Sequence, residues 1–107
     1  MFARIVELRC YSGQTEEACR TIQEKIMPIL KKQRGFCDAI ILASNDDPER
    51  LLGMSFWNRR EDAEAYHRQE YGIIVEILRN LCRIDPRVET FDVDSSTPHH
   101  IVRGKAA

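Results

Sequence analysis

The alternation of apolar-rich and polar stretches along the chain predicts four β-strands. The apolar-rich stretches are residues 2–10, 36–44, 50–57 and 87–93, and they favour β-branched and aromatic residue types. Residues 45–48, with the sequence NDDP, form a strong turn signal between the second and third stretches. These two stretches are therefore expected to pair as a β-hairpin.

Two helices are expected between the strands, and the first begins near Thr15, its predicted N-cap. Apolar residues recur on one stripe at i, i+4 and i+8: Ala18, Ile22 and Ile26. Pro28 is expected to kink or end this helix near Met27, because proline lacks a backbone N–H and crowds the preceding turn. Gly35 is the predicted C′ residue.

The second helix is expected to follow the third strand directly. Asn58 is its predicted N-cap, and Glu61, three residues further on, would complete a capping box. Gly72 predicts a break or a bend in this helix. Residues 73–84 are then expected to form a separate helical piece, which ends at the Asp85-Pro86 pair.

The predicted elements follow the order β-α-β-β-α-β within residues 1–94, which form one domain. This order is typical of the ferredoxin-like α+β fold, in which both helices cover one face of a four-stranded antiparallel sheet. Residues 95–107 are predicted to be a C-terminal tail that could dock on a partner subunit. A chain of 107 residues fits a single domain of this kind.

Both faces of the predicted sheet are largely apolar, which indicates that the sheet has a partner. In the second strand one face carries Ile41 and Ala43, and the other carries Ile40 and Leu42. Helices can cover only one face, and an exposed apolar sheet face favours aggregation. We therefore expect a two-fold homodimer in which a second sheet covers the open face. The alternative is a monomer in which the helices and the tail cover enough apolar surface.

Composition and charge exclude several classes of partner. The net charge is −1, so a nucleic-acid-binding surface is not expected. No apolar run approaches the roughly 20 residues that span a bilayer, and residues 1–30 do not resemble a signal peptide, so a cytoplasmic location without membrane association is predicted. The chain has no glycine-rich phosphate loop and no metal-ligand motif, so neither a cofactor nor a metal is expected.

The cysteines and the charged strand residues each leave alternatives open. The four cysteines form no C-x-x-C pair and are expected to act as small core residues, with a redox or nucleophilic role as the alternative. Charged residues also stand among apolar neighbours in the predicted strands: Arg4, Glu7, Arg9 and Asp38. Pairing across strands or with a partner subunit is favoured for them, and the alternatives are an edge position or a place in a cavity wall.

Aromatic residues and a histidine around the second helix are the candidate site residues. Trp57 ends the third predicted strand and could stack on a flat ligand, although ordinary core packing is the alternative. His67 and Tyr71 lie at i, i+4 on one helix face, where His67 could take a proton from a phenol. The alternative for His67 is a partly exposed residue that packs on Tyr71. Tyr66 points to a different side of the helix.

Four segments together resemble the antibiotic biosynthesis monooxygenase domain family, whose members are dimeric α+β barrels. These segments are Ile5–Leu8, residues 28–36 (PILKKQRGF), the run from Ser55-Phe56-Trp57 through Glu61-Asp62-Ala63 to Tyr66-His67, and Val88–Val93. The resemblance spans about 90 residues, as a one-domain match should. It implies a homodimer whose two sheets pack into a barrel, with one pocket per subunit between the sheet and its helices.

The resemblance leaves several activities open. Some members oxidise polyketide phenols to quinones with molecular oxygen and without metal or flavin, some degrade haem, and others act on quinols or signalling molecules. Haem degradation is disfavoured, because Tyr66 stands where that branch has a tryptophan, Glu76 stands near its later histidine, and the first strand has no asparagine.

The favoured function is therefore a cofactor-independent monooxygenase-like enzyme that acts on a small aromatic or quinol substrate. His67 and Tyr71 are the predicted catalytic residues, and Trp57 and Tyr66 are the predicted substrate-binding residues. The alternative is a non-catalytic, dimeric small-molecule-binding or structural protein of the same fold. An isomerase or lyase with Asp38 and His67 as its acid–base pair is a third possibility. An enclosed cavity reached by Trp57 and His67 would favour the enzyme, and a filled interior would favour the non-catalytic protein.

Overall fold

The computed structural model describes residues 1–95, so the predicted docking of the tail concerns residues outside the described range, apart from residue 95. The elements follow in the order β1 Phe2–Arg9, α1 Thr15–Thr21, π-helical segment η1 Ile22–Ile26, α2 Met27–Lys31, β2 Phe36–Ala43, β3 Arg50–Trp57, α3 Arg60–Leu78 and β4 Arg87–Asp92. All four predicted strands are present, and each agrees with its predicted bounds to within one residue.

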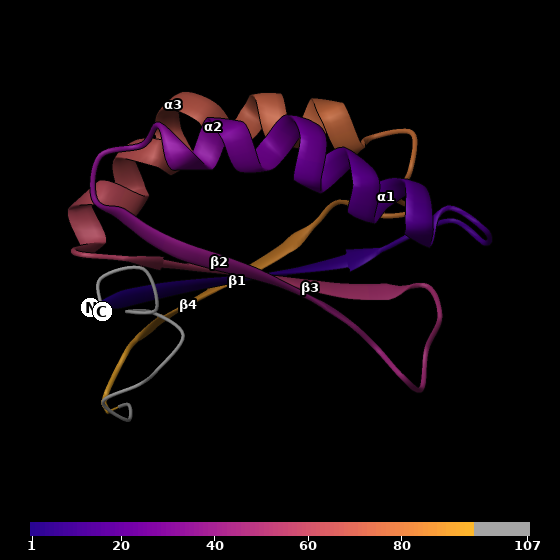
Figure 1. Cartoon of the computed structure of the whole chain (residues 1–107), viewed down its shortest axis with the longest axis horizontal. Coiled ribbons are helices and arrows are strands. Elements are labelled where there is room, and N and C mark those ends of the chain that lie inside the picture. Colours follow the sequence, from indigo (N-terminus) through magenta and orange to yellow (C-terminus); the bar gives the residue numbers. More distant parts are fainter. Residues whose placement is uncertain (96–107) are drawn as a thin grey trace.

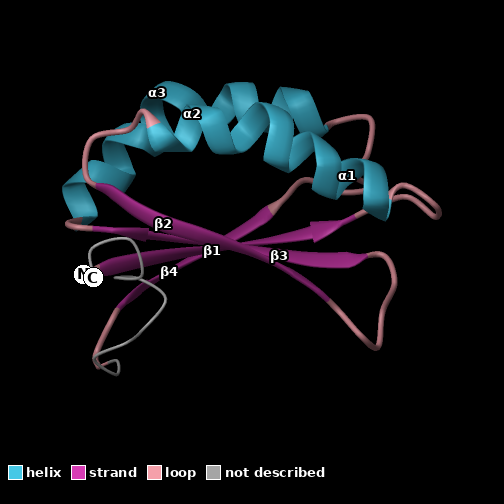
Figure 2. Cartoon of the chain, viewed as in Figure 1, coloured by secondary structure: helices cyan, strands magenta, loops and turns pink. Residues whose placement is uncertain are grey.

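The strands form one antiparallel sheet in the order β2-β3-β1-β4. Figure 1 and Figure 2 show that the helices lie together on one face of this sheet, and no helix of residues 1–95 covers its other face. The predicted ferredoxin-like α+β fold is therefore confirmed. Within the described residues, no helix combines the length and the apolarity needed to cross a bilayer. This finding does not test the cytoplasmic location, which stays a prediction.

The backbone stays helical past Pro28. The hydrogen-bonding pattern changes from α to π over η1, and a new α-helical segment then begins at Met27 with Pro28 in its first turn. The first turn of a helix needs few backbone N–H groups as internal donors, so proline is tolerated there. The expected kink or end is thus replaced by a π-helical turn.

Both predicted N-caps are wrong. The N-cap of α1 is Gln14, and the Thr15 hydroxyl instead donates a hydrogen bond at 2.6 Å to a carbonyl in the loop before β3. The N-cap of α3 is Arg59, and the predicted capping box does not form. The Asn58 side chain accepts a hydrogen bond from the Cys37 thiol at 3.1 Å. In both cases the side chain forms a hydrogen bond with a residue distant in the sequence and does not cap its helix.

The predicted break at Gly72 is also wrong, because α3 is one continuous helix from Arg60 to Leu78. A glycine in a helix interior costs only about 1 kcal/mol relative to alanine, which the packing of the surrounding residues can offset. Ile74 and Leu78, four residues apart, are buried on one stripe of this helix. The helix ends earlier than expected, and Cys82 lies in the following turn, where it forms an isolated β-bridge with Cys10.

Gly35 turns the chain from α2 into β2. Its φ of +78° lies in the left-handed region, which glycine adopts at little cost. It is not the C′ residue of the helix, since the C-cap is Lys32. Its Cα also faces the buried Asp62 carboxyl of α3, so closely that a Cβ on residue 35 would lie 2.0 Å from Asp62 Oδ2.

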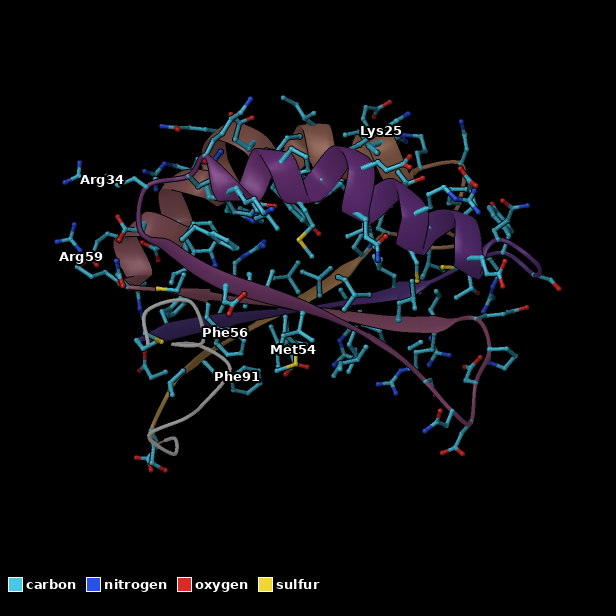
Figure 3. All side chains as sticks on the ribbon, in the orientation of Figure 1. Lys25, Arg34, Met54, Phe56, Arg59 and Phe91 are labelled. Atoms are coloured by element: carbon cyan, nitrogen blue, oxygen red, sulfur yellow. The ribbon has the colours of Figure 1, made fainter. Side chains whose placement is uncertain are left out.

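The two faces of the sheet bury different apolar clusters. The main core lies between the sheet and the helices, and its largest fully buried side chains include Trp57 and Leu51. A β-bulge between Phe36 and Asp38 turns Phe36 toward this core, although simple alternation would place it on the open face. The open face carries a smaller cluster around Phe56. Figure 3 shows Met54, Phe56 and Phe91 on this side, away from the helices.

Candidate functional site

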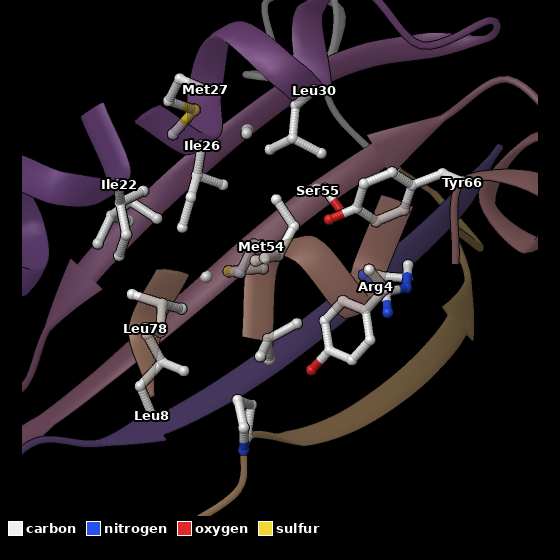
Figure 4. Close-up of a pocket in the computed structure, with 17 residues that line it drawn as sticks. Arg4, Leu8, Ile22, Ile26, Met27, Leu30, Met54, Ser55, Tyr66 and Leu78 are labelled. Atoms are coloured by element: carbon white, nitrogen blue, oxygen red, sulfur yellow. The ribbon is translucent and has the colours of Figure 1, made fainter. Parts of the chain in front are cut away.

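A cavity of about 70 Å³ lies between the helices and the sheet (Figure 4). Its walls are mostly aliphatic and come from η1, α2, α3 and the strands β1, β2 and β3. They include Ile22, Ile26, Ile74 and Leu78. Four polar side chains also line it: Arg4, Ser55, Tyr66 and Tyr71. The volume has room for roughly two water molecules. The cavity is therefore an apolar space with a few polar groups, as small-molecule sites usually are.

Arg4 is the only cation among the residues that line this cavity, and only 3% of it is exposed. Its Nη2 atom donates a hydrogen bond to Nδ1 of His67 at 2.8 Å. Its guanidinium carbon lies 5.2 Å from the ring centroid of Tyr66 and 4.8 Å from that of Tyr71. Among residues 1–95, no carboxylate lies within ion-pair distance of Arg4. Burial lowers the pKa of Arg4.

The other charged residues of β1 are paired with opposite charges. Glu7 accepts a hydrogen bond from Nε of Arg50 at 2.6 Å, and Arg9 forms ion pairs with Glu7 and Asp47. The favoured prediction, pairing across strands, therefore holds for Glu7 with Arg50, whereas Arg9 pairs within β1 and with the loop before β3. Arg4 instead takes one of the alternatives, a place in a cavity wall.

Tyr66 and Tyr71 project from α3 into the cavity wall. Burial raises the pKa of Tyr66 to about 12, and burial also raises the pKa of Tyr71. Both hydroxyls therefore stay protonated near neutral pH. The Tyr71 hydroxyl is buried and has no hydrogen-bond partner in the part of the chain that the structure describes. A ligand oxygen beside Tyr71 would satisfy a donor that is otherwise unpaired.

His67 stacks on Tyr71, as the i, i+4 spacing predicts, with ring centroids 4.7 Å apart and an interplanar angle of 21°. It does not line the apolar cavity. It lines an outer hollow of about 490 Å³, together with Arg60 and Arg68, and Arg4 lines both spaces. Because Nδ1 of His67 accepts from Arg4, the imidazole proton belongs on Nε2. His67 is exposed, but partial desolvation of its ring and the Arg4 charge lower its pKa, so the ring is neutral at pH 7.

Trp57 is fully buried and lies behind the cavity rather than in its wall. Its indole N–H donates to the Ser55 hydroxyl oxygen at 2.9 Å. Its ring lies 5.1 Å from that of Tyr66 and forms an edge-to-face contact with Phe36. Trp57 therefore supports two residues of the cavity wall, Ser55 and Tyr66, from the core side.

Sequence reasoning did not name Arg4 or Ser55 as a site residue, although a place in a cavity wall was one alternative for Arg4. A signal for Arg4 existed, because it alternates with Val6 and Leu8 and so shares their face. Ser55 offers no such signal, since a small polar residue in an apolar strand has many structural uses. The acid–base pair of Asp38 and His67 does not form, because Asp38 pairs in register with Phe56 of the open face.

Within residues 1–95, no group of three or more histidine, cysteine, aspartate or glutamate side chains is placed to hold a metal ion. The polar groups of the cavity are a guanidinium and hydroxyls, all of which can donate hydrogen bonds. Such a set is complementary to a ligand oxygen, above all an ionised one.

Replacing Tyr71 by phenylalanine is expected to raise the free energy of unfolding by about 1 kcal/mol. The substitution removes a buried hydroxyl that has no partner, and such a group costs about 1–3 kcal/mol. Urea denaturation followed by circular dichroism measures the change. The exposed Tyr11 provides the matched control, since Tyr11→Phe should leave the stability unchanged. A loss of stability in Tyr71→Phe would mean that the hydroxyl is satisfied in solution.

Lowering the pH through about 6.5 is expected to destabilise the fold through His67. The pKa of His67 is lowered from 6.5 in the folded chain, so the unfolded chain binds this proton more readily. The free energy of unfolding therefore decreases as the pH is lowered. An NMR titration of the imidazole gives the folded pKa directly. In Arg4→Met the pKa of His67 should rise, because the neighbouring charge is gone. An unchanged pKa of His67 in Arg4→Met would contradict the electrostatic interaction between the two side chains.

Comparisons with known proteins agree with this architecture. The sequence model of the antibiotic biosynthesis monooxygenase family matches residues 1–71. A monooxygenase from the ActVA-Orf6 gene of Streptomyces coelicolor, solved with the ligand Nanaomycin D, has a TM-score of 0.77 at 13% identity and covers 90% of this chain and 89% of its own. A Nitrosomonas europaea protein, named as a candidate antibiotic biosynthesis monooxygenase, has a TM-score of 0.74 at 19% identity over 89% of this chain and all of its own. A comparison with curated proteins found no match.

Proposed function

Because the chain belongs to the antibiotic biosynthesis monooxygenase family, we propose that it is a cofactor-independent monooxygenase-like enzyme that acts on a small aromatic or quinol substrate. One observation carries this proposal. A buried guanidinium without a carboxylate partner among the described residues lies beside a buried hydroxyl without a hydrogen-bond partner, at the wall of an apolar cavity. A phenol or quinol supplies both an apolar ring and an oxygen that fits these two groups.

In this proposal Arg4 binds the substrate oxygen in its ionised form. An opposite charge within a few ångströms lowers the pKa of a phenol, so the substrate is held as the electron-rich anion that reacts with molecular oxygen. The Tyr71 hydroxyl donates a second hydrogen bond to the same oxygen. Fixed donors aimed at a developing or resident negative charge are usually the largest catalytic contribution.

The remaining predicted site residues act around Arg4. His67 accepts the Arg4 hydrogen bond and so positions the guanidinium, instead of acting as the base. Tyr66 offers its ring and hydroxyl to the substrate from the cavity wall, and Trp57 holds Tyr66 from behind. Because Arg4 favours a substrate that is already ionised, no separate general base is required.

The size of the cavity favours a second candidate, a non-catalytic small-molecule-binding or structural protein. Typical small-molecule pockets measure about 300–1,000 Å³, and this cavity measures about 70 Å³. Oxygen uptake by the wild-type protein, measured with a panel of hydroquinones and phenols beside calorimetric binding of the same compounds, separates the two. Uptake with binding supports the enzyme, and binding without uptake supports a small-molecule-binding protein. The absence of both would contradict the enzyme and support a structural protein.

We also propose that the protein is a homodimer in which two open sheet faces pack together. Phe91 is 46% exposed on this face, and a monomer would leave its ring in water. Sedimentation should give a species of about 25 kDa, twice the 12.5 kDa mass of one chain. Phe91→Glu should shift the protein toward 12.5 kDa. Ile73→Glu is the matched control, since Ile73 is 51% exposed but lies on α3. A wild-type species of 12.5 kDa would contradict the dimer.

A further inference from the structure

Cys10 and Cys82 face each other across a short piece of antiparallel backbone. Cys10 follows β1, Cys82 lies in the turn after α3, and the two form an isolated antiparallel bridge. The backbone hydrogen bonds, at 2.9 and 2.7 Å, run between the residues on either side of the cysteines and not between the cysteines themselves. In such a non-hydrogen-bonded pair the Cα atoms are about 4.5 Å apart and the side chains project to the same side. This separation lies within the range of disulfides.

The two thiols also contact each other. Each is a hydrogen-bond neighbour that influences the other's protonation. Both residues are buried, and burial raises the pKa of both thiols, to about 11 for Cys82. They are therefore protonated at neutral pH and react slowly there, since the thiolate is the nucleophile.

An oxidant can reach this pair from one side. Cys82 lines an open hollow of about 450 Å³ that Tyr11, Arg79 and Arg83 also line. Cys10 does not line this hollow and is completely buried, whereas Cys82 is 7% exposed. A small oxidant from solvent therefore meets Cys82 first, with Cys10 directly behind it.

We propose that Cys10 and Cys82 are a site of oxidative modification, where a peroxide converts the two thiols into an intrachain disulfide. The Cys82 thiolate attacks one oxygen of hydrogen peroxide, which breaks the O–O bond, gives the sulfenic acid and releases hydroxide. The Cys10 sulfur then attacks the Cys82 sulfur, forms the S–S bond and displaces the hydroxyl group as water. Two thiols lose two electrons and two protons in total, and one peroxide becomes two water molecules.

The disulfide would tie the turn after α3 to the end of β1. Leu78 and Pro86 stand before and after Cys82 in this region, and both line the apolar cavity. Oxidation would therefore hold one part of the cavity wall in place. The inference does not depend on the proposed reaction, because it rests on the cysteine pair and its access from solvent.

Peptide mapping of the full-length protein after treatment with hydrogen peroxide tests the proposal. Combined cleavage after basic and acidic residues separates Cys10 from Cys19, because Glu16 and Glu17 lie between them. The expected product joins the Cys10 and Cys82 peptides within one chain and disappears on reduction. It should form faster as the pH rises, since the thiolate fraction increases. The melting temperature of the oxidised protein should rise by about 10 °C.

Variants and competing products make the test decisive. Cys82→Ala should abolish both the linked peptide and the rise in melting temperature, whereas Cys37→Ala, on the open face of the sheet, should retain both. The mapping uses wild-type protein, so it remains informative even if a variant folds poorly. A bond between Cys10 and Cys19, a bond between two chains, or oxidation that leaves Cys10 and Cys82 unlinked would overturn the proposal.

Discussion

The Gly35→Ala substitution is expected to lower the free energy of unfolding by about 3 kcal/mol. Two costs add at this position. A non-glycine residue in the left-handed region costs about 1–2 kcal/mol, and the φ of Gly35 is +78°. The new methyl group would also lie 2.0 Å from Oδ2 and 2.6 Å from Cβ of Asp62, so the α3 backbone itself would have to shift. Forcing atoms into a packed site costs about 1–3 kcal/mol.

Two other glycines separate these costs. Gly13 has a φ of +80° but open space around it, so Gly13→Ala should show the backbone cost alone. Gly72 lies in the interior of α3 with open space around it, so Gly72→Ala should stabilise the protein by about 1 kcal/mol. Thermal and urea denaturation of the three variants measure the differences. Equal losses in Gly13→Ala and Gly35→Ala would show that α3 does not approach the turn as closely as described.

Replacing Arg4 by methionine is expected to weaken the binding of ionised phenols by about 100-fold or more while leaving the fold at least as stable. Removing one aimed donor from a charged oxygen typically costs about 3 kcal/mol. Stability should not fall, because a buried cation without a carboxylate partner carries a desolvation cost that methionine does not. The His67 ring left behind is exposed and can bond to water.

The protonation state of the bound ligand is the most direct measurement for this variant. 4-Nitrophenol changes its absorption on ionisation, so titration with wild-type protein should raise the fraction of anion and Arg4→Met should not. Arg9→Met is the matched control, since Arg9 is paired with Glu7 and Asp47 outside the cavity. Unfolding of Arg4→Met, or unchanged binding of the anion, would remove Arg4 from the proposed site.

The parts of the fold that could be predicted are those that depend on local pattern. Strand bounds followed from residue type, and the hairpin followed from the NDDP turn. The helix caps could not be predicted in the same way. Thr15 and Asn58 both have cap-forming side chains, but each is bonded to a residue that is distant in the sequence. These partners come close only when the chain folds, so a rule based on neighbouring residues assigned the side chains to the wrong partner.

The site shows the same division. Helical spacing correctly predicted that His67 and Tyr71 share a face, and it placed Tyr66 on another side. It could not predict that Arg4 of β1 contacts all three residues, because that requires the distance between a strand and a helix. Likewise, Trp57 ends β3 as predicted, but Tyr66 packs against it and lines the cavity in its place. Tyr66, and not Trp57, can therefore contact a ligand in the cavity, and this depends on how the helix packs on the sheet.

Among the described residues, Arg4 is the one that lines both the apolar cavity and the outer hollow. Arg4 therefore borders both spaces, and a different Arg4 rotamer would change the wall that each space shares with it without backbone movement. Side-chain rotations are far faster than the opening of loops or domains. Three arginines, Arg4, Arg60 and Arg68, line the outer hollow against one carboxylate, Glu64, so a negatively charged molecule would be drawn into it toward the guanidinium that is proposed to bind it.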